Sequence, residues 1–380
     1  MRIEVHDSIA DLKAREWNRL AGDRFPFIRH EFLSLAERSG CVADATGWSP
    51  RHIGIYSDSG ALVAAMPLYA KTHSWGEFVF DWSWAQAYQR AGIEYYPKLV
   101  SAAPFTPAPS TRLLTLNNDP ELEAELLLQA VTLARDGGYS SLHILFPNPE
   151  ELPAIENAGL KLRKDCQFHW HNNNYKDFDA FLGTFSSAKR KKARRDRRHV
   201  AEQGVSYRWL DGHTLDEFIW QDVHQLISNT FMQRGSLPYY SLDFFVALSR
   251  QMPDNIHVVL AEKNSEAIAT AVFYRGADTL YGRYWGCNAE LNALHFETCY
   301  HQGIEFCIAN GIRKFEPGTQ GEHKISRGFT PVTTWSAHWL AHPEFFSAIG
   351  QYLEEEQDYI ERYIEAADQH SPFKQGEHGE

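Results

Sequence analysis

The feature that most constrains this chain is an internal repeat, because landmarks of its first half recur in the same order in its second half. Each landmark occurs twice: an aromatic helix start at 26–33 and 238–245, a strand pair at 52–65 and 257–271, a helix end with the next strand at 136–147 and 310–317, and a Gly-His-Trp spacing at 159–170 and 328–339. Four matches in one order are hard to produce by chance. We conclude that the chain holds two copies of one α/β unit.

Hydrophobic periodicity predicts one element order for both copies, β-α-α-β-β-β-α-β-α-β, which is an α/β class with mixed sheets. We expect a first domain over residues 1–172, a basic helical linker over 173–204, a second domain with a C-terminal helix over 205–367, and a disordered tail over 368–380.

Composition agrees with two ordinary soluble domains. The chain has 380 residues, more than one hydrophobic core usually serves, and 43% apolar with 13% aromatic residues is enough to bury two cores. No apolar run is long enough for a membrane span, and the N-terminus has no apolar signal core, so we expect a cytoplasmic protein. Five cysteines without a C-x-x-C spacing indicate free thiols in a reducing compartment and no metal site.

A loop in the second copy carries the strongest chemical signal. Glu322, His323 and Lys324 lie in a glycine-rich loop that follows a short strand ending at Glu316. Polar groups on a loop at the end of a strand are a common place for chemistry in α/β proteins. His323 has the intrinsic pKa of a general base near neutrality, and Glu316 or Glu322 would orient it or share its role. The alternative is that these side chains only tie down a solvated turn.

The first copy contains an aromatic stretch over residues 75–109 that is rich in proline. A strand is predicted at 77–82, and the prolines argue against any regular helix or central strand in the stretch. Such a stretch is usually a lid, a binding wall or a packed loop. Asp81 and Lys98 are its members that packing explains least, because a charge among aromatic rings needs a partner.

We therefore expect a cleft between the copies that binds the acceptor substrate. The predicted lining residues are Asp81, Trp82, Tyr96 and Lys98 from the first copy, with Tyr281 and Arg283, which share one face of a predicted strand, from the second. Lys324 or Arg283 would stabilise an oxyanion or hold an acidic acceptor. The alternative is that the aromatic side chains only pack the loop onto the body of the protein.

A strongly basic segment separates the two copies. Residues 189–199 hold eight basic side chains and one acidic side chain, in a chain whose net charge is −12. A basic helix attracts phosphate by charge and counterion release, and a serine at its N-terminus would add donors for an anion. The predicted phosphate-binding residues are Ser187, Lys189, Arg190, Lys192, Arg194 and Arg195. Nucleic acid, a phosphorylated carrier, anionic lipid or the acidic body of the protein are candidate partners, and the alternative is a solvated helix with weak ion pairs.

The element order resembles the acetyltransferase fold of the GNAT superfamily, and the tandem form resembles its FemAB-like branch. The motifs that carry the resemblance are EFVFDW at residues 77–82, YYPKL at 95–99, PFTP at 104–107 and FEPGTQGEHK at 315–324. Over nearly its whole length the chain is similar to bacterial FemAB-like proteins of peptidoglycan biosynthesis or recognition. The resemblance implies transfer of an acyl or aminoacyl group to an amine, and leaves the substrate open.

One departure from the GNAT pattern bears on the donor. Enzymes of this superfamily that use acetyl-CoA hold its pyrophosphate on a glycine-rich turn after the fourth strand. Here that turn is the glycine-free segment Cys287–Ala293 in the second copy, and a proline-rich loop in the first. Aminoacyl-tRNA, the donor of Fem ligases, is therefore favoured over acyl-CoA, and the basic segment is the candidate for its phosphates. Either donor would be a co-substrate, and we expect no tightly bound cofactor.

The sequence thus predicts a transferase that forms an amide on an amine-bearing small molecule or cell-wall precursor. Direct transfer is preferred over a covalent intermediate, because no Ser-His-Asp or Cys-His grouping has a recognisable spacing. Two alternatives stay open. One is a non-catalytic protein that recognises a sugar or peptide through the aromatic cleft, and the other is a CoA-dependent acyltransferase that acts on a small metabolite.

Overall fold

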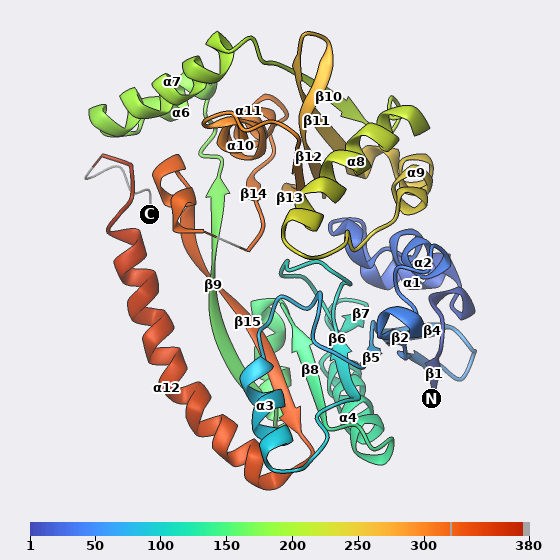
Figure 1. Cartoon of the computed structure of the whole chain (residues 1–380). Helices are drawn as coiled ribbons and strands as arrows, with labels where there is room; N and C mark the ends of the chain where they lie inside the picture. Colours follow the sequence, from blue (N-terminus) through green and yellow to red (C-terminus); the bar gives the residue numbers. More distant parts are fainter. Residues whose placement is uncertain (320, 375–380) are drawn as a thin grey trace. The chain divides into compact units, whose positions relative to one another are not determined.

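The computed structural model describes residues 1–319 and 321–374, which form two compact units (Figure 1). Unit 1 comprises Met1–Cys166 with Thr333–Arg362, and unit 2 comprises Gln167–Val332 with the chain from Tyr363 onward. This division differs from the predicted boundaries near residues 172 and 205. The chain passes between the units inside two long strands instead of at linkers, and the basic segment is a helix of unit 2.

Unit 1 is built on two sheets. Its strands are β1 (Arg2–His6), β2 (Trp48–Pro50), β3 (His52–Tyr56), β4 (Leu62–Met66), β5 (Tyr69–Lys71), β6 (Lys98–Ser101), β7 (Leu114–Thr115), β8 (Ser141–Leu145) and the later part of β15 (Thr330–Leu340). One sheet is 4-stranded, with the order β1-β3-β4-β7. The other runs β2-β5-β6-β8-β15, in which β6 and β8 are parallel and β8 and β15 are antiparallel.

The helices of unit 1 are α1 (Ala14–Ala21), α2 (His30–Arg38), α3 (Trp82–Arg90), α4 (Pro120–Asp136), α5 (Leu152–Asn157) and most of α12 (Pro343–Asp368). The start of α4 is fixed locally, because Asp119 accepts hydrogen bonds from two first-turn amides and Pro120 occupies the first helical position. Leu126, Leu127 and Ala130 then bury one face of α4 in the core of the unit.

Unit 2 contains one sheet with the strand order β10-β11-β12-β13-β14-β9. The strands are β10 (Ser206–Asp211), β11 (Ile256–Lys263), β12 (Glu266–Arg275), β13 (Thr279–Cys287), β14 (Lys314–Glu316) and the later part of β9 (Lys161–His171). Only the β13 and β14 pair of this sheet is parallel among the described strands, and it places Tyr281 directly beside Glu316. β14 ends at Glu316, and the loop that carries the predicted catalytic residues His323 and Glu322 follows it.

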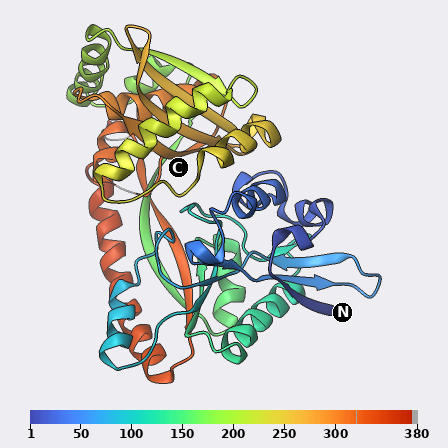
Figure 2. The same ribbon diagram turned by 45° about the vertical axis from the view of Figure 1, so that its right-hand side comes forward.

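The helices of unit 2 are α6 (Phe178–Gly183), α7 (Ser187–Glu202), α8 (Glu217–Gln233), α9 (Leu242–Gln251), α10 (Leu294–Phe296) and α11 (Gln302–Ala309). A π-helical turn, Glu297–His301, joins α10 to α11. Figure 2 shows α8 lying along the sheet of this unit. Close packing of α8 on β13 requires Gly286, since a Cβ atom there would lie 2.3 Å from the backbone nitrogen of Ile227.

Each unit completes its sheet with a strand from the other half of the sequence. β9 and β15 each have 11 residues and each changes unit along its length. Trp170 of β9 pairs with Phe315 of β14 in unit 2, while His338 of β15 pairs with His143 of β8 in unit 1. The repeated Gly-His-Trp spacing of the sequence lies at these two strands, so the repeat marks an exchange of strands between the copies.

Three local predictions differ from the structure. The strand predicted at 77–82 is absent from the described backbone, and α3 lies inside the stretch where prolines argued against a helix. The tail predicted as disordered from residue 368 is ordered as far as Lys374: Phe373 forms a β-bridge with Phe185 and packs against its ring. Residues 375–380 of that prediction lie outside the described residues. Across residues 1–319 and 321–374, no helix has both the length and the apolar content to cross a bilayer.

Candidate active site

In unit 1 the motif residues Asp81 and Lys98 meet in a buried ionic cluster. Lys98 begins β6, is 0% exposed, and uses its three donors on Ser74 Oγ at 2.8 Å, Glu77 Oε2 at 2.7 Å and Asp81 Oδ2. Lys71 at the end of β5 is equally buried, with its Nζ 3.8 Å from the centre of the Trp48 ring. The cluster therefore balances two amines against two carboxylates.

The environment separates the pKa values of these groups. Burial raises the pKa of Glu77 to about 7 and lowers that of Lys71 to about 7. Burial also opposes ionisation of Asp81, but Lys98 and His143 outweigh it and lower the Asp81 pKa to about 2. Within the described ranges, Glu77 Oε1 and Asp81 Oδ1 have no hydrogen-bond partner. Glu77 and Lys71 thus have pKa values near neutrality, and two carboxylate oxygens beside them lack hydrogen-bond partners. These features mark the cluster as a functional candidate.

A chain of hydrogen bonds leads from Asp81 into the sheet. The Tyr95 hydroxyl donates to Asp81 Oδ2 at 2.7 Å and lies 3.2 Å from His143 Nε2. His143 Nδ1 lies 2.6 Å from His338 Nδ1, and His338 Nε2 lies 2.9 Å from Ser336 Oγ. Burial lowers the pKa of both imidazoles, that of His143 to about 3, so both are neutral. This chain was not predicted, although a histidine in an otherwise apolar strand was visible at both positions.

The other predicted residues of unit 1 lie around this cluster. The Tyr96 hydroxyl lies 2.9 Å from Ser74 Oγ, the same hydroxyl that accepts from Lys98. Trp82 begins α3, and its ring meets the Trp75 ring edge-on at 5.2 Å. Asp81, Tyr96 and Lys98 are thus brought together, whereas Trp82 contributes to the surface of the loop. Lys98 is too deeply buried to touch a substrate, so we assign it the positioning of Glu77 and Asp81.

In unit 2 the first half of β13 and the carboxyl end of β14 carry a second buried cluster. The Glu316 carboxylate is 1% exposed and lies 2.7 Å from Lys314 Nζ and 3.7 Å from Arg283 Nη2. Burial opposes its ionisation, but His169, Lys314 and Arg283 together lower the pKa of Glu316, which keeps it ionised. The Arg283 guanidinium lies 5.2 Å from the centre of the Tyr281 ring, as expected for side chains on one strand face.

Lys324 lies in the short 3-10 helix Glu322–Arg327, which the sequence predicted only as a loop. Its side chain turns inward, is 1% exposed as a residue, and donates to the Gly318 carbonyl at 2.5 Å. Burial and the nearby Arg283 charge lower the pKa of Lys324 to about 7. A lysine that titrates near neutrality inside a cationic cluster is a candidate for chemistry.

His323 is held by an unpredicted partner. The Tyr300 hydroxyl lies 2.9 Å from His323 Nε2, and the ring also faces Phe296 at 5.6 Å. Burial, Arg327 and Lys324 lower the pKa of His323, so its neutral form prevails near pH 7. In the described part of the chain no hydrogen bond or ion pair joins His323 to Glu316 or to the exposed Glu322. The described hydrogen bond to the His323 ring is therefore made by Tyr300 and not by either carboxylate.

Tyr300 reaches His323 from the π-helical turn between α10 and α11. Glu297 of the same turn is 4% exposed and binds His301 Nδ1 at 3.0 Å and the Arg197 guanidinium of α7 at 3.0 Å. Burial opposes ionisation of Glu297, but His301 and Arg197 lower its pKa to about 2. A π turn adds a residue to a helix and re-aims its neighbours, and such turns are frequent at functional sites. The sequence predicted a helix that ends at residue 310 and gave no signal for the turn.

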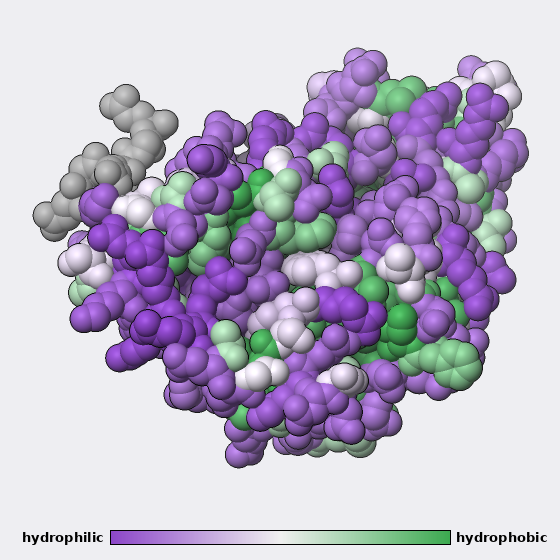
Figure 3. Space-filling view, turned by 90° about the horizontal axis from the view of Figure 1, so that it is seen from above, coloured by the Kyte–Doolittle hydropathy of each residue, from purple (hydrophilic) through white to green (hydrophobic). Residues whose placement is uncertain are grey.

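The predicted phosphate-binding residues lie on α7 of unit 2. Arg194 pairs with Asp179 at 2.8 Å, and Arg190 donates to the Gly183 carbonyl at 3.2 Å. Ser187, Lys189, Lys192 and Arg195 are exposed, and no ion pair of Lys189 or Lys192 occurs within the described ranges. Ser186 takes the N-cap position without a side-chain capping bond. Strongly hydrophilic side chains gather on the left of Figure 3, the side on which Figure 1 draws α7.

The chain holds two units with a GNAT-like fold, and solved structures share this fold. FemX aligns at 10% identity with a TM-score of 0.57 over 92% of this chain and 100% of its own. The C-terminal domain of a candidate lysylphosphatidylglycerol synthetase from Agrobacterium fabrum aligns at 11% identity with a TM-score of 0.55, over 90% and 96%. L-PGS from Bacillus licheniformis aligns at 12% identity with a TM-score of 0.51, over 88% and 98%.

The chain belongs to the FemAB-like family of peptidoglycan biosynthesis and recognition proteins, which matches residues 8–375. No curated protein matches it by sequence. This family is the one that the motifs at 77–82, 95–99 and 315–324 predicted.

Proposed function

We propose that this protein transfers an aminoacyl or acyl group directly to an amine of a peptidoglycan precursor. The observation that carries the proposal is the charge of the unit 2 cluster. Arg283 and Lys314 flank a single buried carboxylate, Glu316, and the charge of Arg283 also acts on the buried Lys324, so positive charge is in excess. The transition state of acyl transfer develops negative charge on the carbonyl oxygen, and a buried positive site stabilises that charge strongly.

The proposed chemistry assigns one role to each side chain. The amine nitrogen attacks the donor carbonyl carbon while neutral His323 accepts the proton that the amine loses. In this scheme the Nε2–H group of His323 donates to the Tyr300 hydroxyl, which leaves Nδ1 of the ring as the basic atom. Protonated Lys324 faces the oxyanion. When the C–O bond of the donor ester breaks, His323 returns its proton to the departing oxygen, so no covalent enzyme intermediate is needed.

For the donor we propose aminoacyl-tRNA rather than acyl-CoA. The exposed residues Lys189, Lys192 and Arg195 of α7 offer three cations, of which only Arg195 has an ion pair in the described structure, at 3.7 Å from Asp196, and this suits a phosphate backbone. The segment Cys287–Ala293, where a CoA pyrophosphate would need glycine amides, contains Glu290 and no glycine.

We propose that unit 1 binds the acceptor substrate. Asp81 Oδ1 and Glu77 Oε1 are buried oxygens without a hydrogen-bond partner in the described structure; Tyr96 contacts the same cluster through Ser74, and Trp82 lies on the surface of the same loop. These groups fit an acceptor that carries an amine and a ring. That they and the pair Tyr281 and Arg283 line one cleft stays a prediction.

The test is a transfer assay with radiolabelled aminoacyl-tRNA or acyl-CoA as donor and soluble peptidoglycan precursors as acceptors, with mass spectrometry of the product. We expect an amide product with the wild type, at least a hundredfold slower formation with His323→Gln and with Lys324→Met, and no change with Arg250→Gln on the exposed face of α9. Product formation that is unaffected by both variants would refute the proposed roles.

One observation favours a second function, recognition without catalysis. Trp75 and Phe80 are each 63% exposed on the loop that also carries Glu77 and Asp81. Exposed aromatic faces bind sugar rings and peptide side chains. A binding protein would retain a precursor on an affinity column, and replacement of Trp75 or Phe80 would weaken this retention. It would form no amide with any donor, so the same transfer assay separates the two functions.

A further inference from the structure

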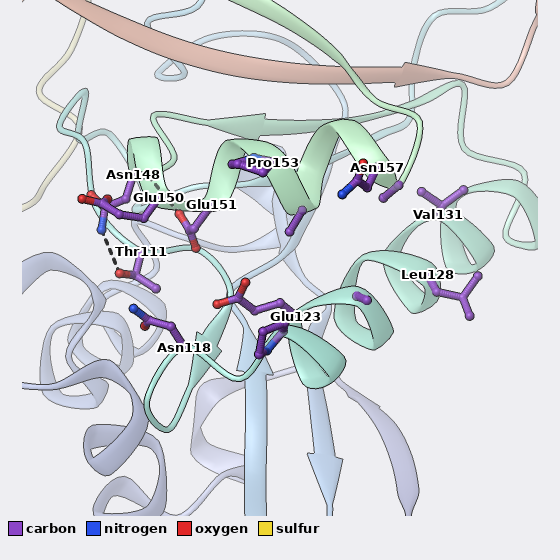
Figure 4. A pocket seen from close by; sticks show the side chains of 14 residues that line it. Thr111, Asn118, Glu123, Leu128, Val131, Asn148, Glu150, Glu151, Pro153 and Asn157 are labelled. Atoms are coloured by element: carbon purple, nitrogen blue, oxygen red, sulfur yellow. Dashed lines mark hydrogen bonds between the residues drawn. The ribbon is translucent and has the colours of Figure 1, made fainter.

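A cavity in unit 1 has no part in the proposed transfer. It has a volume of about 850 Å³ and lies between the first half of α4 and the segment from Asn148 to Ala158, which includes α5 (Figure 4). This volume is in the range of small-molecule sites. None of the residues predicted from the sequence as catalytic, substrate-binding or phosphate-binding lines it.

The chemistry of the cavity wall is acidic on one side and apolar on the other. Glu123, Glu150 and Glu151 are its ionisable side chains, and none of the fourteen lining residues is basic. Leu128 and Val131 of α4, with Pro153, Ala154 and Ala158 of the opposite segment, form the apolar part.

Two of the three carboxylates have an ordinary explanation. Glu150 is exposed to solvent. Glu151 is buried, but its oxygens accept hydrogen bonds from the amides of Arg112 and Leu113, both at 2.7 Å, and of Asn148 at 2.9 Å. Glu151 therefore ties the turn before α5 to the chain before β7, which is a structural role.

Glu123 has no such explanation. It is only 8% exposed, it lines the cavity, and no hydrogen bond or ion pair to its carboxylate occurs in the described ranges. Its electrostatic neighbour is Asp119, a like charge that, together with burial, raises its pKa. The Glu123 side chain is thus mostly covered by protein while its carboxylate faces the cavity without a protein partner, which makes it a candidate to bind a ligand there.

The surroundings exclude two kinds of ligand. A phosphate or carboxylate would meet only like charges, and the first-turn amides of α4 that would attract it already donate to Asp119 at 3.0 and 3.2 Å. A metal ion would need several free ligands, and no group of three or more such side chains suited to a metal occurs in the part of the chain described. A cation with its own hydrogen-bond donors fits one free carboxylate better.

We propose that this cavity binds a protonated alkylamine, whose ammonium group pairs with Glu123 while its hydrocarbon part lies on Leu128, Val131 and Ala154. The amide side chain of Asn118, at the polar end of the lining, offers an oxygen for a remaining N–H group, whereas Asn157 lies at the other end, beside Val131. The site is independent of the transfer reaction, since it shares no residue with the clusters of Lys98 or Lys324.

The experiment is isothermal titration of the full chain, at about pH 8, with three probes of equal length: hexylammonium, hexanoate and hexanol. We expect hexylammonium to bind at one site and at least tenfold more tightly than either other probe. Glu123→Gln should weaken hexylammonium binding at least tenfold, and Ala154→Phe should weaken it by filling the cavity. Glu121→Gln, an exposed carboxylate of the same helical turn, is the matched control and should leave binding unchanged.

Thermal unfolding without ligand adds a second measurement. If Glu123 lacks a partner, Glu123→Gln should raise the melting temperature, whereas removal of a carboxylate with a structural partner lowers it. Failure of hexylammonium to bind, equal binding of hexanoate or hexanol, unchanged binding to Glu123→Gln, or a lower melting temperature of that variant would each overturn the proposal. Because no measurement involves turnover, none of these results bears on the transferase function.

Discussion

His143 and His338 face each other across two antiparallel strands with their Nδ1 atoms 2.6 Å apart. Burial keeps both rings neutral, so one ring donates at this atom, the other accepts, and the two imidazoles are different tautomers. A proton added to the acceptor ring would place two N–H groups against each other. The contact between the first copy's strand β8 and the second copy's strand β15 is thus intolerant of acid.

Acid should therefore destabilise unit 1 through this pair. Both folded pKa values lie below the unfolded value of 6.5, because burial disfavours the charged ring. The unfolded chain then binds protons that the folded chain does not, so stability falls as the pH drops below about 6.5, by up to about 1.4 kcal/mol per pH unit for each histidine. Urea unfolding at several pH values measures this slope. Above about pH 7 the pair contributes no pH dependence.

His338→Asn isolates the contribution, because the Asn amide occupies the place of Nδ1 and does not titrate. We expect the variant to be less stable than the wild type at pH 8 but to lose less stability between about pH 6.5 and pH 5. His213→Asn, at an exposed ring in unit 2, should leave the slope unchanged. An equal acid slope in the wild type and His338→Asn would show that the pair takes up protons freely in the folded state.

Removal of Lys98 should be among the most destabilising single changes in unit 1. Lys98→Met leaves Glu77 and Asp81 buried without their shared cation, which costs roughly 3–5 kcal/mol of unfolding free energy. The triple variant Lys98→Met with Glu77→Gln and Asp81→Asn removes the charges together and should recover most of this loss. Urea titration at pH 7 measures both. A triple variant no more stable than Lys98→Met would mean that packing, not charge, makes Lys98 necessary.

The sequence was most informative where pattern and chemistry repeated. The two-copy fold followed from landmarks such as the spacing that includes His169 and His338. That Asp81 and Lys98 each need a charge partner followed from the cost of a lone charge among aromatic rings, but the sequence did not predict that they pair with each other. The helix at 82–90 was missed because the whole stretch was judged by its prolines. These begin only at Pro97, so nothing in 82–90 opposed a helix.

The site was predicted less completely because its contacts join residues far apart in the chain. Glu77 stands four residues before Asp81 and belonged to a recognised motif, so its role was within reach of the sequence. Tyr300 was not, because a π turn aims it at His323 and no residue pattern announces such a turn. The inward turn of Lys324 likewise depends on a 3-10 helix whose glycine neighbours indicated a loop.

If His323 is the base and Lys324 the oxyanion donor, the transfer rate should have a narrow pH optimum. The rate should rise with pH as His323 loses its proton below pH 6.5, and fall as Lys324 loses its own at about 7. Lys324→Arg keeps a cation that does not titrate in this range, so the descending limb should disappear even if the maximal rate falls. Rates under saturating substrate measure this. Persistence of the descending limb in Lys324→Arg would exclude Lys324 as its source.

The donor assignment predicts a particular dependence on salt. Binding through phosphates weakens with salt in proportion to the number of counterions released, whereas binding of a CoA ester in a pocket depends on salt much less. Lys189→Gln, Lys192→Gln and Arg195→Gln together should weaken tRNA binding and reduce the slope of log affinity against log salt by about 0.7–0.9 for each phosphate that is no longer neutralised.

Arg197→Gln is no substitute for these changes, since Arg197 is engaged by Glu297 and Glu305 and its removal would disturb the turn that carries Tyr300. Arg250→Gln on α9 is the matched exposed control and should change neither affinity nor slope. An unchanged slope in the triple variant, or CoA binding that is tight and insensitive to salt, would move the donor away from α7.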